Sequence, residues 1–401
     1  MTQSGLIVRV AAKGDGATAD GRHRALAAPG DVIEADGSLT LGPDHVAPVC
    51  RHFPACGACQ VQHLSDRALA EFVADRVAGA ARGQGIDPGP VVPAHVSPAF
   101  TRRRASLHAQ AIGTRVVLGF REAASHRLVD VKQCAVLAPP LFALIAPLRA
   151  LLAARKDRKL AVDIDMTLAD QGVALGLSGL TVEGLAATEA IGEFARAHRL
   201  ARLTIDSGYG PDTVWEPEPV TITLGATPVP LPPGAFLQAT ADGEAALVDA
   251  AREWLAGAAT VADLFAGLGT FAFALAAGGA KVLAAEAARD AHLACQAAAR
   301  QHGRAVHALH RDLYRNPLQV DELDRFAAIL LDPPRAGARD QIALIAASHV
   351  ARVVYIACNP ASWARDAAML IAGGYRLAGL RAVGQFRWST HVELASLFVR
   401  D

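Results

Sequence analysis

Cys358 stands where an apolar run ends, in the stretch VVYIACNPASWARD at residues 353–366. The run predicts a buried strand, and Asn359 and Pro360 then begin a predicted helix. A purely structural thiol is more natural inside an apolar run than at its end. Cys358 is therefore a candidate nucleophile, provided that the helix N-terminus or a nearby base raises the thiolate fraction of a group whose free pKa is ~8.5.

Acidic residues stand at the ends of other predicted strands, namely Glu286 in KVLAAEA, Asp312 in AVHALHRD and Asp332 in ILLDPPR. Gly267 lies in the turn of DLFAGLGTF, where a glycine lets a ligand approach the backbone closely. Glu286 is placed to bind a ribose diol through its carboxylate oxygens. No third glycine follows at the dinucleotide spacing, so the pattern favours S-adenosylmethionine over NAD. Simple structural turns are the alternative for the glycines and for Asp332.

His391 and Glu393 lie in STHVELASL, a predicted last strand, and the alternation of a strand puts both on one face. A nucleophile beside a methyl donor suits a carbon that is inert until attacked, and carbon 5 of a pyrimidine fits that description. Addition of the Cys358 thiolate at carbon 6 makes an enolate that can take the methyl group. A base must then remove the proton from carbon 5, and Glu393 is the candidate. A salt-bridged surface glutamate is the alternative.

Cys50, Cys56 and Cys59 form a C-x5-C-x2-C cluster in VCRHFPACGACQ, and Cys134 is the best candidate for a fourth ligand. Four thiolates suit a [4Fe-4S] cluster or tetrahedral zinc. Three close cysteines and one remote cysteine are more typical of iron-sulfur ligation than of paired zinc knuckles. The pattern therefore predicts a [4Fe-4S] cluster, with zinc and merely packed thiols as alternatives. The five-residue gap argues against radical chemistry with S-adenosylmethionine.

Composition restricts the possible partners and compartments. The chain has 39 basic and 39 acidic residues, so its net charge argues neither for nor against a polyanionic partner. The run Arg102, Arg103 and Arg104 is nevertheless a candidate for contact with an RNA backbone. The N-terminus lacks the pattern of a signal peptide, and no apolar run is long and unbroken enough to span a membrane. We therefore expect a cytoplasmic protein with no membrane partner, in which cysteines serve as ligands or catalytic groups.

The 401 residues, 52% of them hydrophobic, are predicted to form three domains that position these groups. Residues 1–47 contain short strands with Gly and Asp turns and predict a small β module. Residues 48–230 contain the cysteine cluster, a helical stretch at 62–83 and a mixed α+β pattern. Residues 231–401 alternate strand and helix, which predicts a parallel sheet with helices on both faces. Ligands of such sheets bind beyond the carboxyl ends of the strands, where the reactive residues stand.

Taken together, the motifs resemble the RNA (uracil-5-)methyltransferase family over nearly the whole chain. The matching elements, in order, are the cysteine cluster, PGAFLQAT, DLFAGLGTF, Glu286, LDPPR, YIACNPASWARD and STHVE. The resemblance implies an α/β fold with a C-terminal Rossmann-like class I methyltransferase domain and a mixed α+β central domain that carries an iron-sulfur cluster. The N-terminal module resembles the start of a TRAM RNA-binding domain and is shorter than a complete one.

The resemblance also implies roles for individual residues. Cys358 is implied as the nucleophile and Glu393 as the base, with a [4Fe-4S] cluster on Cys50, Cys56, Cys59 and Cys134. The implied contacts to S-adenosylmethionine come from Gln238, Phe265, Thr270, Glu286, Asp312 and Asp332.

The cluster cysteines indicate bacterial 23S rRNA as the RNA substrate, because the tRNA-acting branch of the family typically lacks them. Methylation of a tRNA uridine, and a non-catalytic iron-sulfur protein that only binds RNA, are the alternatives. The target uridine must be unstacked, since a duplex hides carbon 6 from the thiolate. We expect the protein to be a monomer.

Overall fold

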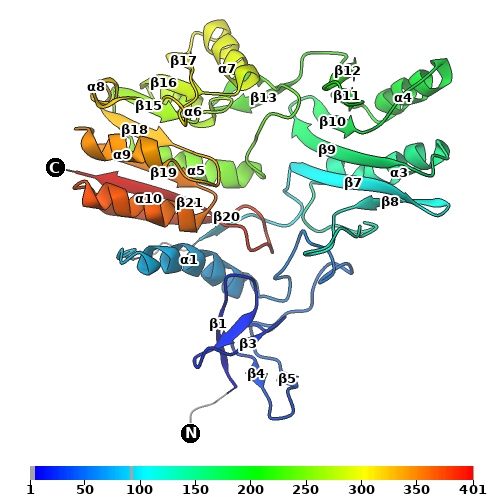
Figure 1. Cartoon of the computed structure of the whole chain (residues 1–401), viewed down its shortest axis with the longest axis horizontal. Helices are drawn as coiled ribbons and strands as arrows, with labels where there is room; N and C mark the ends of the chain where they lie inside the picture. The colour runs from blue at the N-terminus through cyan, green and yellow to red at the C-terminus, as the bar shows by residue number, and fades with distance from the viewer. Residues whose placement is uncertain (1–4, 91–93, 401) are drawn as a thin grey trace.

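The computed structural model describes residues 5–90 and 94–400. Figure 1 shows three parts: a small β module at the N-terminus, a mixed sheet with helices beside it, and a larger α/β unit that carries the C-terminus. The expected α/β architecture with a C-terminal Rossmann-like sheet is therefore confirmed.

The α/β unit is built on a sheet with the strand order β17-β16-β15-β18-β19-β21-β20-β6. The strands from β17 to β19 run parallel, and β21 runs antiparallel to its neighbours β19 and β20. The central strands are buried along their length, as expected for a parallel sheet with helices on both faces. The strands are β6 (His95–Val96), β15 (Thr260–Leu264), β16 (Lys281–Glu286), β17 (Val306–His310), β18 (Ala328–Leu331), β19 (Arg352–Ala357), β20 (Arg376–Gly384) and β21 (Glu393–Val399).

Helices cover both faces of this sheet and form two separate hydrophobic cores. One core contains buried residues of α5 and α6, such as Leu247 and Phe271, and the other contains Ile342 of α9 and Trp363 of α10. The helices of this unit are α5 (Ala241–Trp254), α6 (Thr270–Ala277), α7 (Arg289–Gln301), α8 (Val320–Leu323), α9 (Arg339–Ala347) and α10 (Pro360–Ala372). The predicted alternation of strand and helix is confirmed.

An N-terminal segment is built into the same unit. Helix α1 (Asp66–Gly83) packs on α10 and β20, and it buries Phe72, Val73 and Val77 in the α10 core. Its N-cap is Ser65, whose side chain accepts the N–H of Ala68. β6 then adds to the edge of the sheet beside β20. The helical stretch predicted at 62–83 is confirmed, but its packing on the C-terminal sheet was not visible in the sequence.

The central part is a mixed sheet with the strand order β12-β11-β10-β9-β7-β8, and a hairpin of β13 and β14 follows it. Where one helix was predicted around residues 140–155, the chain forms two, which meet at Leu144. The elements are β7 (Arg104–Ile112), β8 (Arg115–Gly119), α2 (Pro139–Ala143), α3 (Ile145–Ala154), β9 (Ala161–Ala169), β10 (Gly172–Ser178), α4 (Leu185–Ala197), β11 (Arg202–Asp206), β12 (Asp212–Trp215), β13 (Thr221–Leu224) and β14 (Thr227–Pro230).

The N-terminal module has a small sheet of β1, β2 and β3 and a hairpin of β4 and β5. Asp31 joins its parts, because its buried carboxylate accepts the N–H groups of Ala28 and Gly42, both at 2.7 Å. The strands are β1 (Ile7–Val10), β2 (Gly16–Thr18), β3 (His23–Arg24), β4 (Val32–Ile33) and β5 (Leu39–Thr40). The predicted module of short strands and turns is confirmed.

Candidate active site

The carboxyl ends of four neighbouring parallel strands bring most of the predicted site residues together. Leu264 of β15 pairs with Ala285 of β16 on one side and with Leu331 of β18 on the other, and Leu331 pairs with Tyr355 of β19. The chain therefore leaves the sheet along one edge, which is where open α/β sheets bind ligands. The predicted residues at this edge are Phe265 and Gly267 after β15, Glu286 at the end of β16, Asp332 after β18 and Cys358 after β19.

Cys358 and Glu393 come from adjacent strands. Ala357, the last residue of β19, pairs with Leu394 of the antiparallel β21, so Cys358 and Glu393 are next in the same register. Glu393 is 5% exposed. Burial raises its pKa to about 7, while a hydrogen bond from Gln385 acts in the opposite direction. A carboxyl group that titrates near neutral pH beside a cysteine is suited to general base catalysis.

The electrostatic environment of Cys358 is not what the helix beyond it predicts. Asn359 is the N-cap of α10, so the helix N-terminus expected next to the thiol is present. Burial, and then the negative charges of Glu393 and Asp332, nevertheless raise the pKa of Cys358 to about 11. The positive charge of Arg335 acts in the opposite direction. The pKa of Cys358 is therefore raised although the N-terminus of a helix follows it.

The prediction that His391 lies on the last strand, on the same face as Glu393, is wrong. β21 begins at Glu393, and His391 belongs to the loop 385–392. In this loop Trp388 has a φ of +61°, and its carbonyl oxygen accepts the N–H of Gln60 at 2.7 Å. Gln60 holds this turn in place. The alternating side-chain directions of β21 therefore do not extend back to His391.

The turn between β15 and α6 uses two glycines for different reasons. Gly267 has a φ of +56°, and a Cβ atom there would meet no heavy atom within 4 Å, so a ligand can approach the backbone closely. Gly269 has a φ of +92°, and a Cβ atom would lie 2.8 Å from the Phe273 ring and 3.0 Å from the sulfur of Cys295. The Glu286 carboxylate accepts the N–H of Gly267 at 2.8 Å. Glu286 therefore holds the turn and keeps further lone pairs for a ligand hydroxyl.

Phe265 has a φ of +63°, which is rare for a residue with a side chain, at the point where β15 ends. Its ring packs against Tyr314, with 5.4 Å between ring centroids. The Asp312 carboxylate accepts the N–H of Tyr314 at 3.0 Å, and Thr270 begins α6. Strained backbone of this kind clusters at ligand sites. Tyr314 is a site residue that the sequence analysis missed.

Hydrogen bonds between amide and carboxyl side chains connect the predicted cofactor-binding residues of this edge to the predicted catalytic residues. Gln238 Nε2 donates to Asp332 Oδ2 at 3.4 Å, and Gln238 Oε1 accepts from Gln385 Nε2 at 2.7 Å. Burial raises the pKa of Asp332 well above its usual range, and the negative charges of Glu393 and Asp263 add to this effect. Gln385 was not predicted from the sequence, because its partner Gln238 is 147 positions away and no motif includes it.

Two further charged groups belong to this edge. The positive charge of Arg335 in ILLDPPR lowers the pKa values of both Cys358 and Glu393. Asp263, the last acid before the glycine turn, is completely buried, and burial raises its pKa to about 8. The edge therefore combines one arginine with three carboxyl groups, those of Asp263, Asp332 and Glu393, whose pKa values are raised by burial.

The four cysteines predicted to bind a cluster line one small cavity. Cys50, Cys56 and Cys59 are buried, Cys134 is partly buried, and all four are free thiols. Burial raises the pKa of Cys59 to about 12, and it also raises the pKa values of Cys56 and Cys134. Among the residues that the structure describes, no group of three or more His, Cys, Asp or Glu side chains is arranged to hold a metal ion.

The three consecutive arginines do not form one exposed face. The Arg103 side chain is 9% exposed and donates to Glu244 at 2.6 Å. The Nε of Arg102 donates to the carbonyl oxygen of Arg104 at 3.0 Å. The Arg104 guanidinium lies over the ring of Phe236, which is 61% exposed. The prediction that the whole run contacts an RNA backbone is therefore wrong for Arg103, whose charge is neutralised inside the protein.

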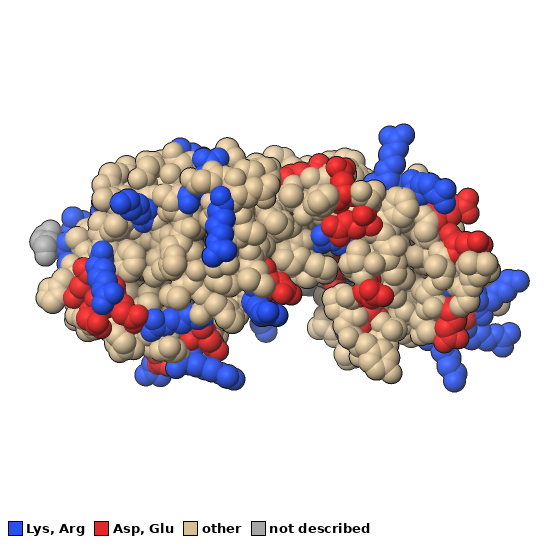
Figure 2. All heavy atoms as spheres, turned by 90° about the horizontal axis from the view of Figure 1, so that it is seen from above, with Lys and Arg blue, Asp and Glu red and all other residues tan. Residues whose placement is uncertain are grey.

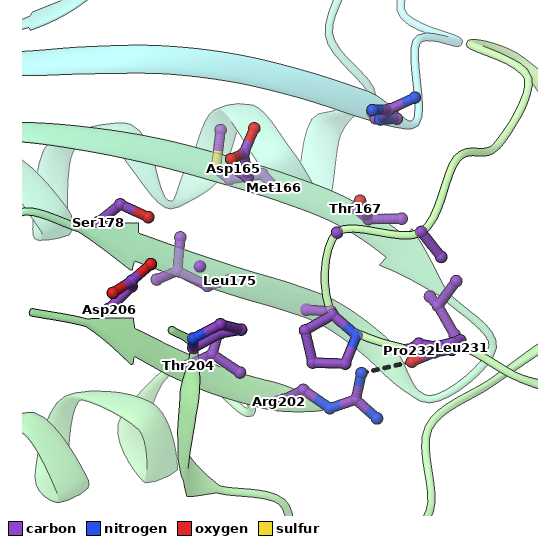
Figure 3. Close-up of a pocket in the computed structure, with 17 residues that line it drawn as sticks. Asp165, Met166, Thr167, Leu175, Ser178, Arg202, Thr204, Asp206, Leu231 and Pro232 are labelled. Carbon is purple, nitrogen blue, oxygen red and sulfur yellow. Dashed lines mark hydrogen bonds between the residues drawn. The ribbon is translucent and has the colours of Figure 1, made fainter. Parts of the chain in front are cut away.

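A separate pocket lies against the central sheet (Figure 3). It is lined by parts of β9, β10 and β11 and by the segment Leu231–Ala235. Arg202 in this pocket is already paired with Glu216 at 2.6 Å and donates to the carbonyl oxygen of Leu231. None of the predicted catalytic, cofactor-binding or cysteine residues lines this pocket, although Arg104 of the arginine run does, so it is not part of the strand-edge site.

Known proteins resemble this chain over most of its length. A sequence model described as tRNA (Uracil-5-)-methyltransferase matches residues 232–401. A protein of Zymomonas mobilis, described as an uncharacterized RNA methyltransferase, is 48% identical over 98% of this chain and 99% of its own length. The 23S rRNA (uracil(1939)-C(5))-methyltransferase RlmD of Edwardsiella ictaluri is 35% identical over 90% of this chain and 83% of its own length. The chain belongs to the RNA (uracil-5-)methyltransferase family.

The fold of this methyltransferase is also that of a solved structure. The tRNA (uracil-54, C5)-methyltransferase of Pyrococcus abyssi, solved in complex with S-adenosyl-L-homocysteine, superposes with a TM-score of 0.77 and 21% identity over the whole length of both chains. Within the described residues of the methyltransferase, every helix is too short or too polar to span a bilayer.

Proposed function

We propose that this methyltransferase methylates carbon 5 of a uridine in 23S rRNA by way of a covalent adduct on Cys358. The observation that carries the proposal is the register of β19 and β21, which puts a cysteine and a carboxyl group with a pKa near 7 side by side at the ligand-binding edge. The 35% identity to an RlmD enzyme supports rRNA as the substrate class.

In this proposal Cys358 and Glu393 act in sequence on the pyrimidine ring. The sulfur of Cys358 adds to carbon 6, which makes carbon 5 electron-rich. After carbon 5 has been methylated, Glu393 removes its remaining proton, and the electron pair left behind expels the sulfur. Arg335 favours the charged forms of both side chains, so it supports the thiolate before addition and the carboxylate before proton removal.

S-adenosylmethionine supplies an electrophilic methyl group. The glycine turn, the ribose-binding position of Glu286 and the aromatic pair of Phe265 and Tyr314 are supports for a nucleoside-containing ligand. The residues that we propose to hold this ligand are Gln238, Phe265, Gly267, Thr270, Glu286, Asp312 and Asp332.

A [4Fe-4S] cluster on Cys50, Cys56, Cys59 and Cys134 is the second part of the proposal. The four cysteines line one cavity, and burial raises the pKa values of Cys56, Cys59 and Cys134, whose thiolate forms bonding to iron would stabilise. Each of the four cysteines would hold one iron of such a cluster, so their sulfurs would not need to meet at a single point as the ligands of one metal ion do. Iron and acid-labile sulfide, measured per chain after anaerobic purification, test this assignment. A colourless protein that contains zinc instead would contradict it.

RNA contact is proposed near the loop 385–392. Burial and then the positive charges of Arg335, Arg102 and Arg76 lower the pKa of His391, so the charges of three arginines act on this part of the site. Figure 2 shows that on one face of the protein basic and acidic side chains are interspersed, without a large surface of one sign. We therefore expect local phosphate contacts beside the active site rather than a broad basic surface.

The decisive experiment for the function uses wild-type protein, S-adenosylmethionine with a labelled methyl group, and fragments of 23S rRNA and tRNA. Nucleoside analysis by mass spectrometry should find labelled 5-methyluridine in the rRNA fragment. Label in tRNA instead would show that tRNA, and not 23S rRNA, is the substrate. RNA binding without any methyl transfer would favour a non-catalytic protein. The division at residues 47 and 230, the monomeric state and the cytoplasmic location stay predictions.

A further inference from the structure

One side of the central sheet is apolar and packed, whereas the other side is polar. Along β10 every second residue is buried, and these residues share a hydrophobic core with α3 and α4. The residues between them face the other way, because side chains alternate along a strand. On that side the strands carry short or polar residues, namely Asp165 and Thr167 of β9, Ala174, Gly176 and Ser178 of β10, and Thr204 and Asp206 of β11.

The pocket of Figure 3 lies on this polar side and contains all of these residues. Its volume is about 210 Å³. Since a water molecule takes up about 30 Å³ in the liquid, the pocket is large enough for a single nucleobase. Ser178 and Asp206 lie side by side in Figure 3, as their pairing between β10 and β11 requires.

Gly176 leaves space at the floor of the pocket. It pairs with Asp165 of β9 and with Thr204 of β11 in an unbroken register, so no β-bulge explains a glycine at this position. A Cβ atom on Gly176 would lie 3.3 Å from the hydroxyl oxygen of Thr204. A glycine inside a regular strand often marks a place where a ligand approaches the backbone closely.

Two carboxylates offer hydrogen-bond acceptors to such a ligand. Oδ1 of Asp206 accepts the N–H groups of Gly208 and Gly210, at 2.8 and 3.1 Å. Oδ1 of Asp165 accepts the hydroxyl of Ser106. The hydrogen bonds among the described residues therefore fix both carboxylates and leave the second oxygen of each for a ligand.

The charges of the pocket favour a base over a phosphate. Arg202 is already neutralised by Glu216, at 2.6 Å, whereas the two free carboxylates would repel a phosphate. An exocyclic amino group, in contrast, donates to a carboxylate. Adenine, guanine and cytosine carry such a group, and uracil does not.

The wall of the pocket continues into the strand-edge site. Gln238, which donates to Asp332 at 3.4 Å, follows the pocket residue Ala235 by three positions, a span of at most about 11 Å. Between them Phe236 is 61% exposed, and the Arg104 guanidinium lies 5.1 Å from its ring centroid. Exposed rings stack on bases and arginines bind phosphates, so this segment suits an RNA strand that runs from the site to the pocket.

We infer that this pocket binds the base of a nucleotide near the target uridine, and that this base carries an exocyclic amino group. The inference rests on the proposed function, because it takes RNA as the substrate. The pocket recognises the RNA beside the uridine, whereas the reaction takes place at the strand edge.

Gly176→Leu tests the pocket by filling it. Binding of a 23S rRNA fragment is measured with S-adenosylhomocysteine present, so that no methyl group is transferred. We expect the Kd for RNA to rise about tenfold, with unchanged affinity for S-adenosylhomocysteine. Gln110→Leu is the matched control, because Gln110 is exposed on the same side of β7 outside the pocket. This control should leave the Kd for RNA unchanged.

Asp206→Asn tests the preference for an amino group without filling the pocket. Asparagine keeps one oxygen for Gly208 and Gly210 and replaces the other oxygen with an NH2 group. Each nucleotide beside the target uridine is replaced in turn by its counterpart without the amino group, such as inosine for guanosine. Wild-type protein should lose about tenfold in affinity at one position, and the variant should lose less there, as a double-mutant cycle requires of a direct contact.

Both assays measure binding, so their outcome is independent of methyl transfer. If Gly176→Leu is folded and binds RNA as tightly as wild-type protein, the inference is overturned. It is also overturned if the effect of Asp206→Asn is the same at every position of the RNA. If the expected couplings are found and wild-type protein forms no 5-methyluridine, the proposed function fails and the pocket stands. If wild-type protein binds no RNA, both are wrong.

Discussion

The strand edge and the cysteine loop both gather reactive side chains, but by different means. At the edge, the parallel register of neighbouring strands places Glu286, Asp332 and Cys358 in one row. In the cysteine loop, three thiols close together in the chain meet Cys134 from a segment far along it, and no regular element sets their spacing. The strands therefore position their reactive side chains directly, whereas the positions of the four cysteines depend on the group that binds between them.

The cysteine loop contacts the strand-edge site through Gln60. Gln60, next to Cys59, donates its N–H to the carbonyl oxygen of Trp388 and accepts the N–H of Thr390 with its side chain. Both partners lie in the loop that leads into Glu393. The cysteine loop thus helps to position the catalytic base, although none of its cysteines is at the strand edge.

The largest effect is expected at the strand edge. Cys358→Ala removes the atom that bonds to carbon 6, so methylation should fall by a factor on the order of 10⁴ or more. The assay is transfer of a labelled methyl group to RNA. Cys295→Ala is the control for loss of a buried thiol, because Cys295 lies on α7, where it packs beneath the glycine turn and has no part in the covalent route. Retained turnover in Cys358→Ala would refute the covalent route.

Glu393→Gln should separate addition from release. Without the carboxylate, the proton on carbon 5 stays in place and the sulfur cannot leave, so turnover should fall by roughly 10²- to 10⁴-fold. A covalent complex of protein and RNA should accumulate, visible as a slower band on a denaturing gel. If RNA still binds and no such band forms, Glu393 is not the base.

Cys59→Ser tests how far the cysteine loop supports the edge. Loss of one ligand should reduce the iron content, and Gln60 would then hold the loop 385–392 less firmly. A shift of about 1 Å in a catalytic group can cost on the order of 10²-fold, so turnover should fall, but less than in Cys358→Ala. Unchanged turnover in iron-free protein would show that the two regions are independent.

Turnover should also depend on pH. The pKa of Glu393 is raised to about 7, so the fraction of its carboxyl group that is ionised and can act as a base decreases as the pH falls below that value. The rate of adduct release should therefore increase about tenfold per pH unit below 7 and level off above it. Single-turnover release of 5-methyluridine RNA measures this step. A rate that is flat between pH 5 and pH 7 would contradict the assignment.

The smallest effects separate the two glycines of the turn. Gly269→Ala places a methyl group against Phe273 and Cys295, so it should destabilise the fold by about 1–3 kcal/mol, measured by denaturant unfolding. Gly267→Ala meets no neighbour, so it should cost less stability while weakening the binding of S-adenosylhomocysteine in calorimetry. Equal effects of the two variants on both measurements would show that Gly267 does not face the ligand.

The sequence by itself determined the strand edge and the metal-ligand candidates. Buried apolar runs end at Glu286 and Cys358, and the carboxyl ends of parallel strands must meet at one edge, so local pattern was enough. The sequence did not show that Gln385 and Trp388 contribute to the site, or where His391 lies. Their places depend on hydrogen bonds to Ala239 and Gln60, across separations that no local period encodes. Only the packed chain decides such contacts, because buried polar groups must find partners wherever the fold brings them.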